Sequence, residues 1–342
     1  MLRIAHLIDD TNPGGVTRYL DFIAQDPALQ AMGDHQIVPV PRTRPTAVRV
    51  EADLIVSHLT VNWRALPGLM MLRSRHAHIP MVHIEHSYSA GFMAHNVTKR
   101  RRFRTLLRTA YALFDRVVAV SATQADWIRR HGLVSDPALC VIPPCVDLSS
   151  FRTVEDPQGP VRVIGAIGRF DRQKGFDLLI EAFRGLDDPH LRLRMIGDGP
   201  EALALKALAE GDARIEFPGF TADPAAAIAG CDVMAMPSRW EPYGLAAQEA
   251  RAAGRPVLAS AIDGLSDPGR GLHLIHDNSV PAWSAALSQL VQGRVDTMFA
   301  AQIETSPERQ TRIGWSRLLH SLELSQASDP ATASDAPTPA GA

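Results

Sequence analysis

The sequence has few cysteines, almost no net charge and no long apolar run. Its 342 residues include three cysteines without C-x-x-C spacing, which argues against a disulfide scaffold or a cysteine zinc site and favours a reducing compartment. A formal net charge of −2 gives no global reason to expect nucleic acid. No apolar run approaches the ~20 residues of a membrane span, and MLRIAHLIDD turns acidic too early for a signal peptide. We therefore expect a cytoplasmic protein.

Several cofactor-binding motifs are also missing. No G-x-G-x-x-G follows an expected strand, which argues against a dehydrogenase, and no G-x-x-x-x-G-K-[ST] occurs, which disfavours a P-loop. No D-x-D is present, so the carboxylate pair by which other sugar-transfer folds hold a divalent metal is absent. His83 and His86 lack further ligands of convincing metal spacing. We expect no metal and no other cofactor.

Short apolar runs, alternating with helical stretches, are what the chain has instead. Near-continuous rather than alternating hydrophobicity predicts buried strands of a parallel sheet with helices on both faces. Right-handed crossovers would then give an α/β protein with two doubly wound sheets, whose ligand crevices face one cleft. The expected strands span residues 2–8, 36–40, 54–57, 81–84 and 117–120 in the first half, and 161–167, 191–196, 215–217, 232–236 and 256–260 in the second.

A polar stretch with proline and glycine, TVEDPQGP, follows Phe151 and predicts a domain boundary. We expect one Rossmann-like domain over residues 1–158 and another over residues 159–307. Residues 308–324 are expected to form a helix that packs back toward the first domain. Residues 325–342 are small, polar or proline and predict a disordered tail.

The most informative segment is PSRWEPYGLAAQEARAAG, from Pro237 to Gly254. A helix that begins near Gly244 directs free backbone N–H groups and its positive dipole end at a neighbour, which suits a phosphate. Glu241 and Glu249 flank this anion site, and carboxylates accept hydrogen bonds from neutral hydroxyls. The arrangement predicts a nucleotide-sugar site. The alternative is an amphipathic helix with two solvated glutamates.

Two cations and two glycine loops add to this site. GRFDRQKGFDLLIEAF places Arg169 and Lys174 at the start of a helix, where cations oppose the dipole and need an explanation. They would stabilise the charge of a leaving nucleoside diphosphate without a metal, although an ordinary surface pair is the alternative. Gly15, in DDTNPGGVTRY, and Gly197, in IGDGP, permit close approach of a ligand.

Polar residues near the strand ends of the first half are candidates for facing the cleft, namely His58, His83, Glu85 and His86. His83 falls within an apolar run and is expected to be an interior residue. His86 falls where the strand gives way to a loop, and we predict that it donates a hydrogen bond to a sugar hydroxyl or to the transferring centre. A loop histidine without a role is the alternative.

Together these motifs resemble the glycosyltransferases of family 4, retaining enzymes of the GT-B fold. The resemblance covers most of the chain and rests, in order, on GGVTRY, IEHS, VVAVSATQADWI, VIPPCVDLSSF, GRFDRQKG, IGDGP, FPGF with CDVMAMPS, and E-x7-E. It implies an acceptor-side first domain, a nucleotide-sugar-binding second domain, and metal-independent hexosyl transfer with retention of configuration.

Site residues follow from the resemblance one by one. It implies a catalytic set and a donor-binding set. These are Arg169 and Lys174 on the donor diphosphate, Glu241 on the transferred sugar, and His86 from the first domain; then Gly15, Gly197, the amides of Gly244 and Leu245 on the phosphate, Glu249 on the ribose, and Phe220 at the base.

The chain departs from the family after PVLAS. The usual Gly-Gly-x-Pro-Glu turn is replaced by AIDGLSDPGRGLHLIHDNS, in a loop that normally lies over the donor. We expect an altered donor preference or weakened donor binding. Alternatives are a nucleotide-sugar 2-epimerase or a catalytically inactive nucleotide-sugar-binding protein. Neither the donor's base and sugar nor the acceptor can be read from the residues, and a lipid-linked or polysaccharide acceptor of the bacterial envelope is implied by the family only.

Residues 95–114, HNVTKRRRFRTLLRTAYALF, predict one basic amphipathic helix. Each cation near an anionic lipid surface contributes about 1 kcal/mol, so this helix could hold the protein on the inner face of a membrane. The alternative is a helix whose apolar stripe packs on its own sheet while its charges are solvated.

Overall fold

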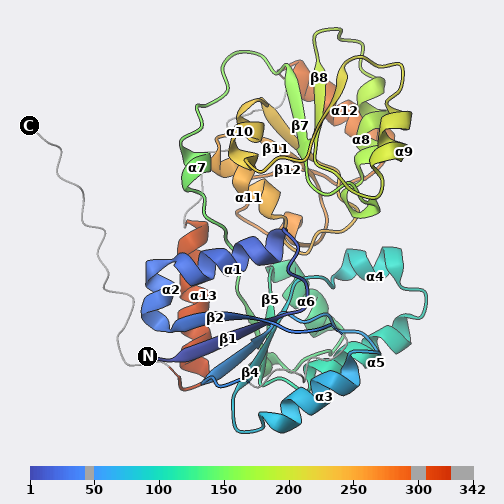
Figure 1. Ribbon diagram of the computed structural model, residues 1–342. Coiled ribbons are helices and arrows are strands. Elements are labelled where there is room, and N and C mark those ends of the chain that lie inside the picture. The colour runs from blue at the N-terminus through green and yellow to red at the C-terminus, as the bar shows by residue number, and fades with distance from the viewer. Residues whose placement is uncertain (43–49, 294–305, 325–342) are drawn as a thin grey trace, which may run out of the picture.

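A computed structural model describes residues 1–42, 50–293 and 306–324. The chain forms two α/β units, one above the other in Figure 1, and each is built on a six-stranded sheet. Every strand pairing in both sheets is parallel. This confirms the predicted class, two doubly wound parallel sheets.

The first sheet has the strand order β2-β1-β3-β4-β5-β6. Helices α3, α5 and α6 bury their apolar faces on one side of it, and α1, α2 and α13 cover the other. The strands are Arg3–Ile8 (β1), Asp34–Pro39 (β2), Leu54–Ser57 (β3), Met81–Glu85 (β4), Arg116–Ala119 (β5) and Leu139–Val141 (β6), and the helices are Gly15–Gln25 (α1), Pro27–Met32 (α2), Leu66–Arg75 (α3), Ala90–Asn96 (α4), Arg100–Tyr111 (α5), Ala122–Arg130 (α6) and Pro307–Ser321 (α13).

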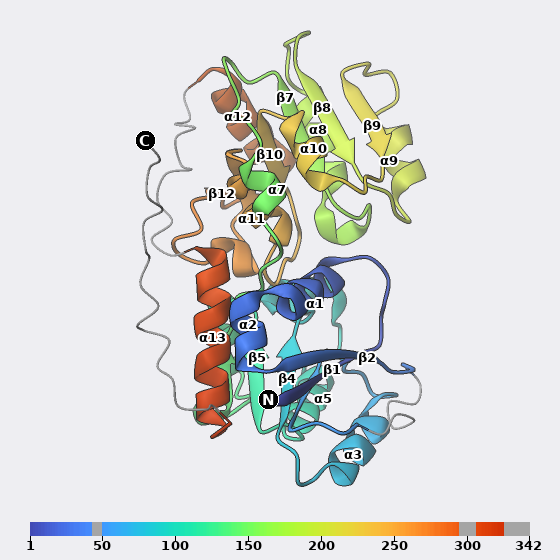
Figure 2. The ribbon, with the colours of Figure 1, turned by 60° about the vertical axis from the view of Figure 1, so that its left-hand side comes forward.

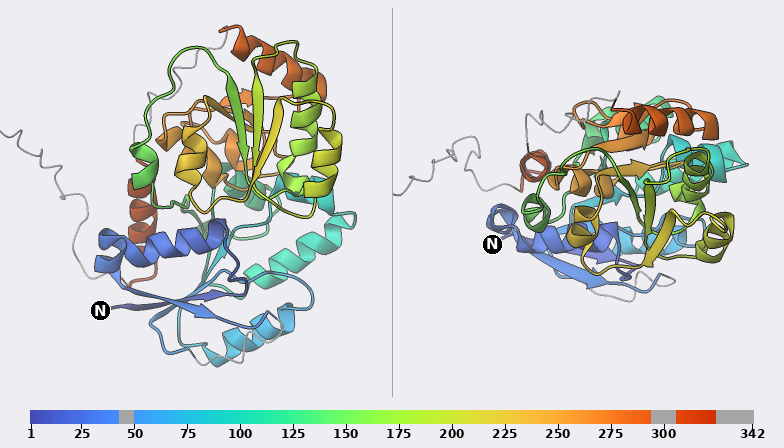
Figure 3. Two further views of the ribbon diagram at one scale, coloured as in Figure 1. Left: turned by 45° about the horizontal axis from the view of Figure 1, so that its top comes forward. Right: turned by 90° about the horizontal axis from the view of Figure 1, so that it is seen from above.

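The second sheet has the order β12-β11-β10-β7-β8-β9. Figure 3 shows α8, α9 and α12 together on one side of this sheet, where they share one apolar core, while α10 and α11 lie on the other. The strands are Val163–Ile167 (β7), Arg192–Ile196 (β8), Ile215–Gly219 (β9), Val233–Met236 (β10), Val257–Ser260 (β11) and His273–Ile275 (β12), and the helices are Ser149–Arg152 (α7), Phe176–Arg184 (α8), Ala202–Leu208 (α9), Pro224–Ala229 (α10), Leu245–Ala252 (α11) and Val280–Val291 (α12).

The prediction of a single basic helix over residues 95–114 is wrong. The chain leaves α4 after Asn96, and α5 begins at Arg100, so the basic run KRRR lies at a helix start. The apolar stripe of α5 is buried on the first sheet, whereas most of its cations are exposed. Among the described residues, no helix has the length and apolar character needed to cross a membrane. The predicted disordered tail, residues 325–342, lies outside the described residues.

Helix α13 follows the second unit in sequence but packs on the first. Figure 2 shows it standing along the lower unit beside α2. Trp315 is fully buried, and its indole N–H donates to the Tyr19 hydroxyl at 3.1 Å. Arg312 donates to the Asp26 carboxylate at 2.6 Å. The chain therefore crosses between the units twice.

The rebuilt loop after β11 ties the two units together through two aspartates. Asp263 accepts hydrogen bonds from Ser89 Oγ at 2.7 Å and from the Gly91 amide at 3.0 Å, both at the start of α4. Asp267 accepts from the amides of Ala122 and Thr123 at 2.7 and 2.8 Å, at the start of α6. Carboxylates stabilise helix N-termini because they satisfy unpaired amides and complement the dipole. The loop thus joins the second unit to two helix starts of the first.

We predict that the double substitution Asp263→Asn and Asp267→Asn lets the units move apart while each stays folded. Asparagine tolerates the φ of 38° at position 263, so the backbone there should not change. It has one acceptor oxygen and no charge, which weakens the hydrogen bonds to the starts of α4 and α6, each worth about 1–2 kcal/mol. The radius of gyration from small-angle scattering should rise. Asp187→Asn, at an exposed aspartate of the second unit, is the matched control, and equal scattering from both variants would contradict the prediction.

Candidate functional site

Two helix N-termini lie close together where the two units are in contact. A Cβ atom added to Gly15, the first residue of α1, would lie 3.2 Å from Leu245 Cδ1, on the first residue of α11. Gly244 caps α11 with φ of 88°, a left-handed conformation that favours glycine, and a Cβ there would lie 2.7 Å from Leu265. The sequence-predicted Gly15, Gly244 and Leu245 are therefore brought together from the two units.

Glu241 and Lys174 form an ion pair beside these helix starts. Lys174 Nζ lies 2.6 Å from Glu241 Oε2, and only 7% of Glu241 is exposed. The Glu241 amide donates to Asp263 at 3.1 Å, so the loop that joins the units also orients this glutamate. The carboxylate is thus held in place by its own cation and by the neighbouring loop.

Glu249 forms an ion pair between the two units. Its Oε1 lies 2.5 Å from Arg18 NH1 on α1, and 3% of the residue is exposed. Burial raises the pKa of Glu249 above its ordinary value, although Arg18 opposes this shift. Glu241 and Glu249 are both buried and paired, which excludes the alternative of two solvated glutamates.

The prediction that Arg169 and Lys174 both lie at a helix start is only half correct. Lys174 ends the short 3₁₀ turn Arg172–Lys174, directly before α8, and its stem packs over Gly168. Arg169 lies earlier, in the loop after β7. Its side chain is 73% exposed and 3.8 Å from Asp171. The periodicity of the sequence did not show that a 3₁₀ turn separates the loop from the helix.

Gly197 and Phe220 lie at the ends of the neighbouring strands β8 and β9. The space that a side chain at Gly197 would need is filled by the Gly168 carbonyl, so this glycine allows two strand-end loops to pack. Phe220 is 72% exposed, as a ring available for stacking would be. Their predicted contacts with a donor stay predictions.

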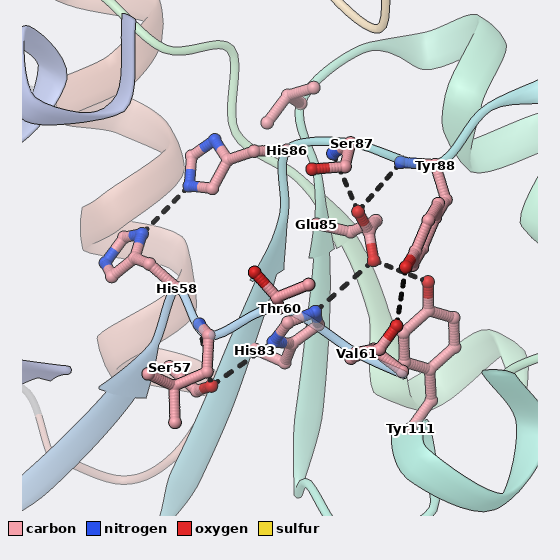
Figure 4. A network of polar contacts seen from close by, with 12 residues as sticks. Ser57, His58, Thr60, Val61, His83, Glu85, His86, Ser87, Tyr88 and Tyr111 are labelled. Carbon is pink, nitrogen blue, oxygen red and sulfur yellow. Dashed lines mark hydrogen bonds and ion pairs between the residues drawn. The ribbon is translucent and has the colours of Figure 1, made fainter. Parts of the chain in front are cut away.

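His86 lines a cavity of about 250 Å³ at the carboxyl ends of β1, β3 and β4. Its Nε2 lies 2.8 Å from His58 Nδ1 (Figure 4). Burial lowers the pKa of His86 to about 4, although Glu85 opposes the shift. The imidazole is therefore neutral at pH 7, and it binds by hydrogen bonds rather than by charge.

Glu85 holds the loop that carries His86. Its carboxylate accepts hydrogen bonds from the Ser87 and Tyr88 amides at 2.7 and 2.9 Å and from the Tyr111 hydroxyl at 2.7 Å (Figure 4). Burial alone would raise the pKa of Glu85, but hydrogen bonds, first of all from His83, lower it. Glu85 is 3% exposed, and it supports the wall of the cavity by fixing the loop that carries His86.

Sequence reasoning missed the charged mouth of this cavity. Arg42 lies 3.2 Å from Asp9 and 3.4 Å from Asp10, and Thr60 donates its amide to Asp9 at 3.2 Å. The signal that could have found them was the pair of carboxylates directly after the first strand, where α/β sheets bind ligands. These groups suit a ligand that carries hydroxyls.

A second cavity, of about 320 Å³, lies elsewhere. It is bordered by α7, α11 and the first turn of α13, and it includes Arg251 and Arg270. No residue predicted for the donor or the chemistry lines it, so its larger size does not make it the candidate site. Within the described ranges, no three His, Cys, Asp or Glu side chains are grouped so as to hold a metal ion.

Known proteins match both units. Residues 13–150 match the family described as Glycosyltransferase Family 4, and residues 161–293 match Glycosyl transferases group 1. The D-inositol 3-phosphate glycosyltransferase of Corynebacterium aurimucosum is 29% identical over 280 residues, which are 72% of this chain and 65% of that protein. The chain thus spans just under two thirds of this relative's length.

Solved structures share the fold over nearly the whole chain. Sucrose-phosphate synthase from Thermosynechococcus elongatus has a TM-score of 0.68 at 20% identity and covers 95% of this chain and 97% of its own. Anabaena HepE in complex with UDP and glucose has a TM-score of 0.65 at 19% identity, covering 93% and 95%. The two family matches cover one unit each, and each unit has its own parallel sheet, so this chain belongs to the family 4 glycosyltransferases with the GT-B fold.

Proposed function

We propose that this protein is a metal-independent, retaining glycosyltransferase that moves a sugar from a nucleoside diphosphate sugar to an acceptor. One observation carries the proposal: two helix N-termini meet beside Lys174, between two buried glutamates. The helix ends and the cation suit a diphosphate, and the carboxylates suit the neutral hydroxyls of two sugars. A single ligand that offers both is a nucleotide sugar.

The ion pairs of the structure indicate how a donor would bind. Hydroxyls of the transferred sugar would compete with Lys174 for Glu241. Lys174, once released, would turn toward the diphosphate. Ribose hydroxyls would compete with Arg18 for Glu249 in the same way. Arg169 is exposed, and rotation of its side chain would bring it to the diphosphate. Phe220 would stack on the base. Gly197 would line the donor's approach.

The chemistry would be mainly electrostatic. As the bond from the sugar to the diphosphate breaks, negative charge grows on the leaving group, and Lys174, Arg169 and the start of α11 stabilise it. The acceptor hydroxyl would attack from the side of the first-domain cavity, and the departing phosphate would assist its deprotonation. His86 would orient the sugar by hydrogen bonding.

Relatives suggest which donors and acceptors to test first. HepE binds UDP and glucose, so UDP-glucose is the first donor for this chain. One relative named above acts on D-inositol 3-phosphate, and another solved neighbour is a lipopolysaccharide outer core galactosyltransferase. We propose an acceptor rich in hydroxyls, such as a lipid-linked or polysaccharide acceptor of the bacterial envelope, because Asp9, Asp10 and Arg42 border the first-domain cavity.

We expect the protein to release nucleoside diphosphate from one member of a panel of nucleotide hexoses, and Lys174→Ala to lower this turnover at least about 100-fold. The variant loses a charge that acts mainly in the transition state, so turnover should fall far more than the loss of the ion pair with Glu241 lowers the melting temperature. Lys206→Ala, at an exposed lysine of α9, is the control. Equal turnover in Lys174→Ala would refute the assignment. Nucleotide binding without any release would favour the inactive binding protein, and epimerised donor would favour the epimerase.

We expect Glu249→Gln to weaken nucleoside diphosphate binding at least about tenfold. A neutral amide has one acceptor oxygen, whereas a carboxylate has two and binds hydroxyls more strongly because it is charged. The amide also no longer attracts Arg18. Isothermal titration calorimetry measures the affinity. Glu210→Gln, at an exposed glutamate, is the matched control. Unchanged affinity in Glu249→Gln would remove the ribose-binding role.

We also propose that the start of α5 contacts anionic membrane surfaces. Lys99, Arg100 and Arg101 are exposed there, and Arg102 lies over the ring of Trp63, which is 42% exposed. The apolar stripe of α5 is already buried, so the contact would be electrostatic rather than an insertion.

Co-sedimentation with vesicles that contain anionic lipid should show binding at low salt that is lost at high salt. Reversing the charge at positions 99, 100 and 101 to glutamate should abolish it. The control reverses Arg129 and Arg130, on α6. No binding at low salt, or equal binding by both variants, would end this proposal.

A further inference from the structure

Four histidines form a line across the first sheet. They come from segments far apart in sequence, but their strands are neighbours in the order β2-β1-β3-β4. His35 Nδ1 lies 2.9 Å from His6 Nε2, His6 Nδ1 lies 3.0 Å from His58 Nε2, and His58 Nδ1 lies 2.8 Å from His86 Nε2. A continuous chain of imidazole hydrogen bonds therefore runs from β2 to the first-domain cavity.

Counting protons limits this chain to two arrangements. A neutral imidazole has one N–H and one lone pair, so four rings supply four protons for three links and two ends. If every link contains one proton, the fourth proton is on His86 Nδ1, facing the cavity, or on His35 Nε2, at the far end. Burial keeps the rings neutral: the pKa values of His6 and His58 fall well below the ordinary value, and those of His35 and His86 fall to about 4.

The surroundings of the far end favour one of the two arrangements. His35 Nε2 is buried and has no hydrogen-bond partner among the described residues. A proton on this nitrogen would be a buried N–H without an acceptor, which is costly, whereas a buried lone pair without a donor is tolerated more often. Each ring then donates from Nδ1, and His86 Nδ1–H faces the cavity.

Aromatic rings hold the line in place from both ends of the chain. Tyr19 of α1 packs edge-on against His58 and His86, with centroids 6.5 and 6.0 Å away. Trp315 of α13 packs against His6 and His35 at 5.6 and 5.4 Å. The titratable groups that act on the line from neighbouring residues are Glu85 and His83 near His86, and Asp34 near His35.

We propose that His35, His6 and His58 are positioning residues that hold His86 as the neutral Nδ1–H tautomer, with Nδ1–H as the donor to a carbohydrate hydroxyl in the first-domain cavity. This is the direction expected from the sequence, in which His86 donates. The identity of the hydroxyl rests on the proposed function, whereas the tautomer does not. Changing the tautomer of His86 alone would set its Nε2–H against the Nδ1–H of His58, with the two nitrogens 2.8 Å apart, so all four rings must change together.

The tautomer can be measured on the full-length protein without any ligand or activity. Nitrogen-15 labelling of histidine, with spectra that correlate ring nitrogens and ring protons, distinguishes Nε2–H from Nδ1–H. His86→Gln assigns the His86 signals by removing them. We expect an Nδ1–H form that does not titrate between pH 6 and 8. An Nε2–H form, or titration near the ordinary pKa of about 6.5, would overturn the proposal.

Breaking the chain at its centre tests the positioning role. In His6→Phe, His86 should show a mixture of tautomers, and kcat should fall at least about tenfold with a changed pH profile, because a wrongly protonated histidine costs catalysis. His6→Gln, which keeps a donor and an acceptor, should restore part of the loss, and His78→Gln, at an exposed histidine, is the control. A single unchanged tautomer in a folded His6→Phe would refute the positioning role. If His6→Phe does not fold, the measurement on the unaltered protein still decides the tautomer. If the protein transfers no sugar at all while His86 shows the expected form, the proposed function fails and the tautomer stands.

Discussion

The electrostatics of the contact region between the units depend on two helix N-termini that lie close together. The N-termini of α1 and α11 each carry about half a positive charge, and the Leu245 side chain packs over Gly15. Both helices follow the carboxyl ends of parallel strands, so the handedness of two doubly wound sheets that face each other brings these ends together. Two positive helix ends close to each other favour negative neighbours. Glu241 and Glu249 lie beside them, and each is buried enough to need a cation of its own, Lys174 or Arg18.

The contacts between the units and the positions of the two buried glutamates are linked through shared residues. Asp263 accepts from the start of α4 in the first unit and from the Glu241 amide in the second, so one side chain joins the units and orients a glutamate. Arg18 reaches Glu249 from the opposite unit. A ligand that displaced Arg18 would remove one contact between the units and add its own. The loop after β11, which departs from the family pattern, therefore connects the two units in this chain.

Local features of the sequence predicted the parts of the fold that depend on neighbours along the chain. Ten strands were predicted from continuous apolar runs, and β6 and β12 were missed because each has only three residues. The prediction of one helix over the basic segment was wrong for a different reason. The apolar periodicity of this segment is real, but the residues between Asn96 and Arg100 are not helical. The contacts that define the site join residues distant in sequence, such as Arg18 with Glu249 and Ser89 with Asp263. A single sequence carries no record of such pairs.

By itself, the sequence determined the fold class, the family resemblance and the loop-helix segment with Glu241 and Glu249, because apolar runs, turn residues and residue spacing are local properties. Tertiary structure alone decided which cation neutralises which glutamate, and that the rebuilt loop binds two helix starts. It also decided that His35, His6, His58 and His86 form one line. The physical reason is that parallel strands place side chains from distant segments about 5 Å apart, and only the strand order of the sheet settles which of them meet.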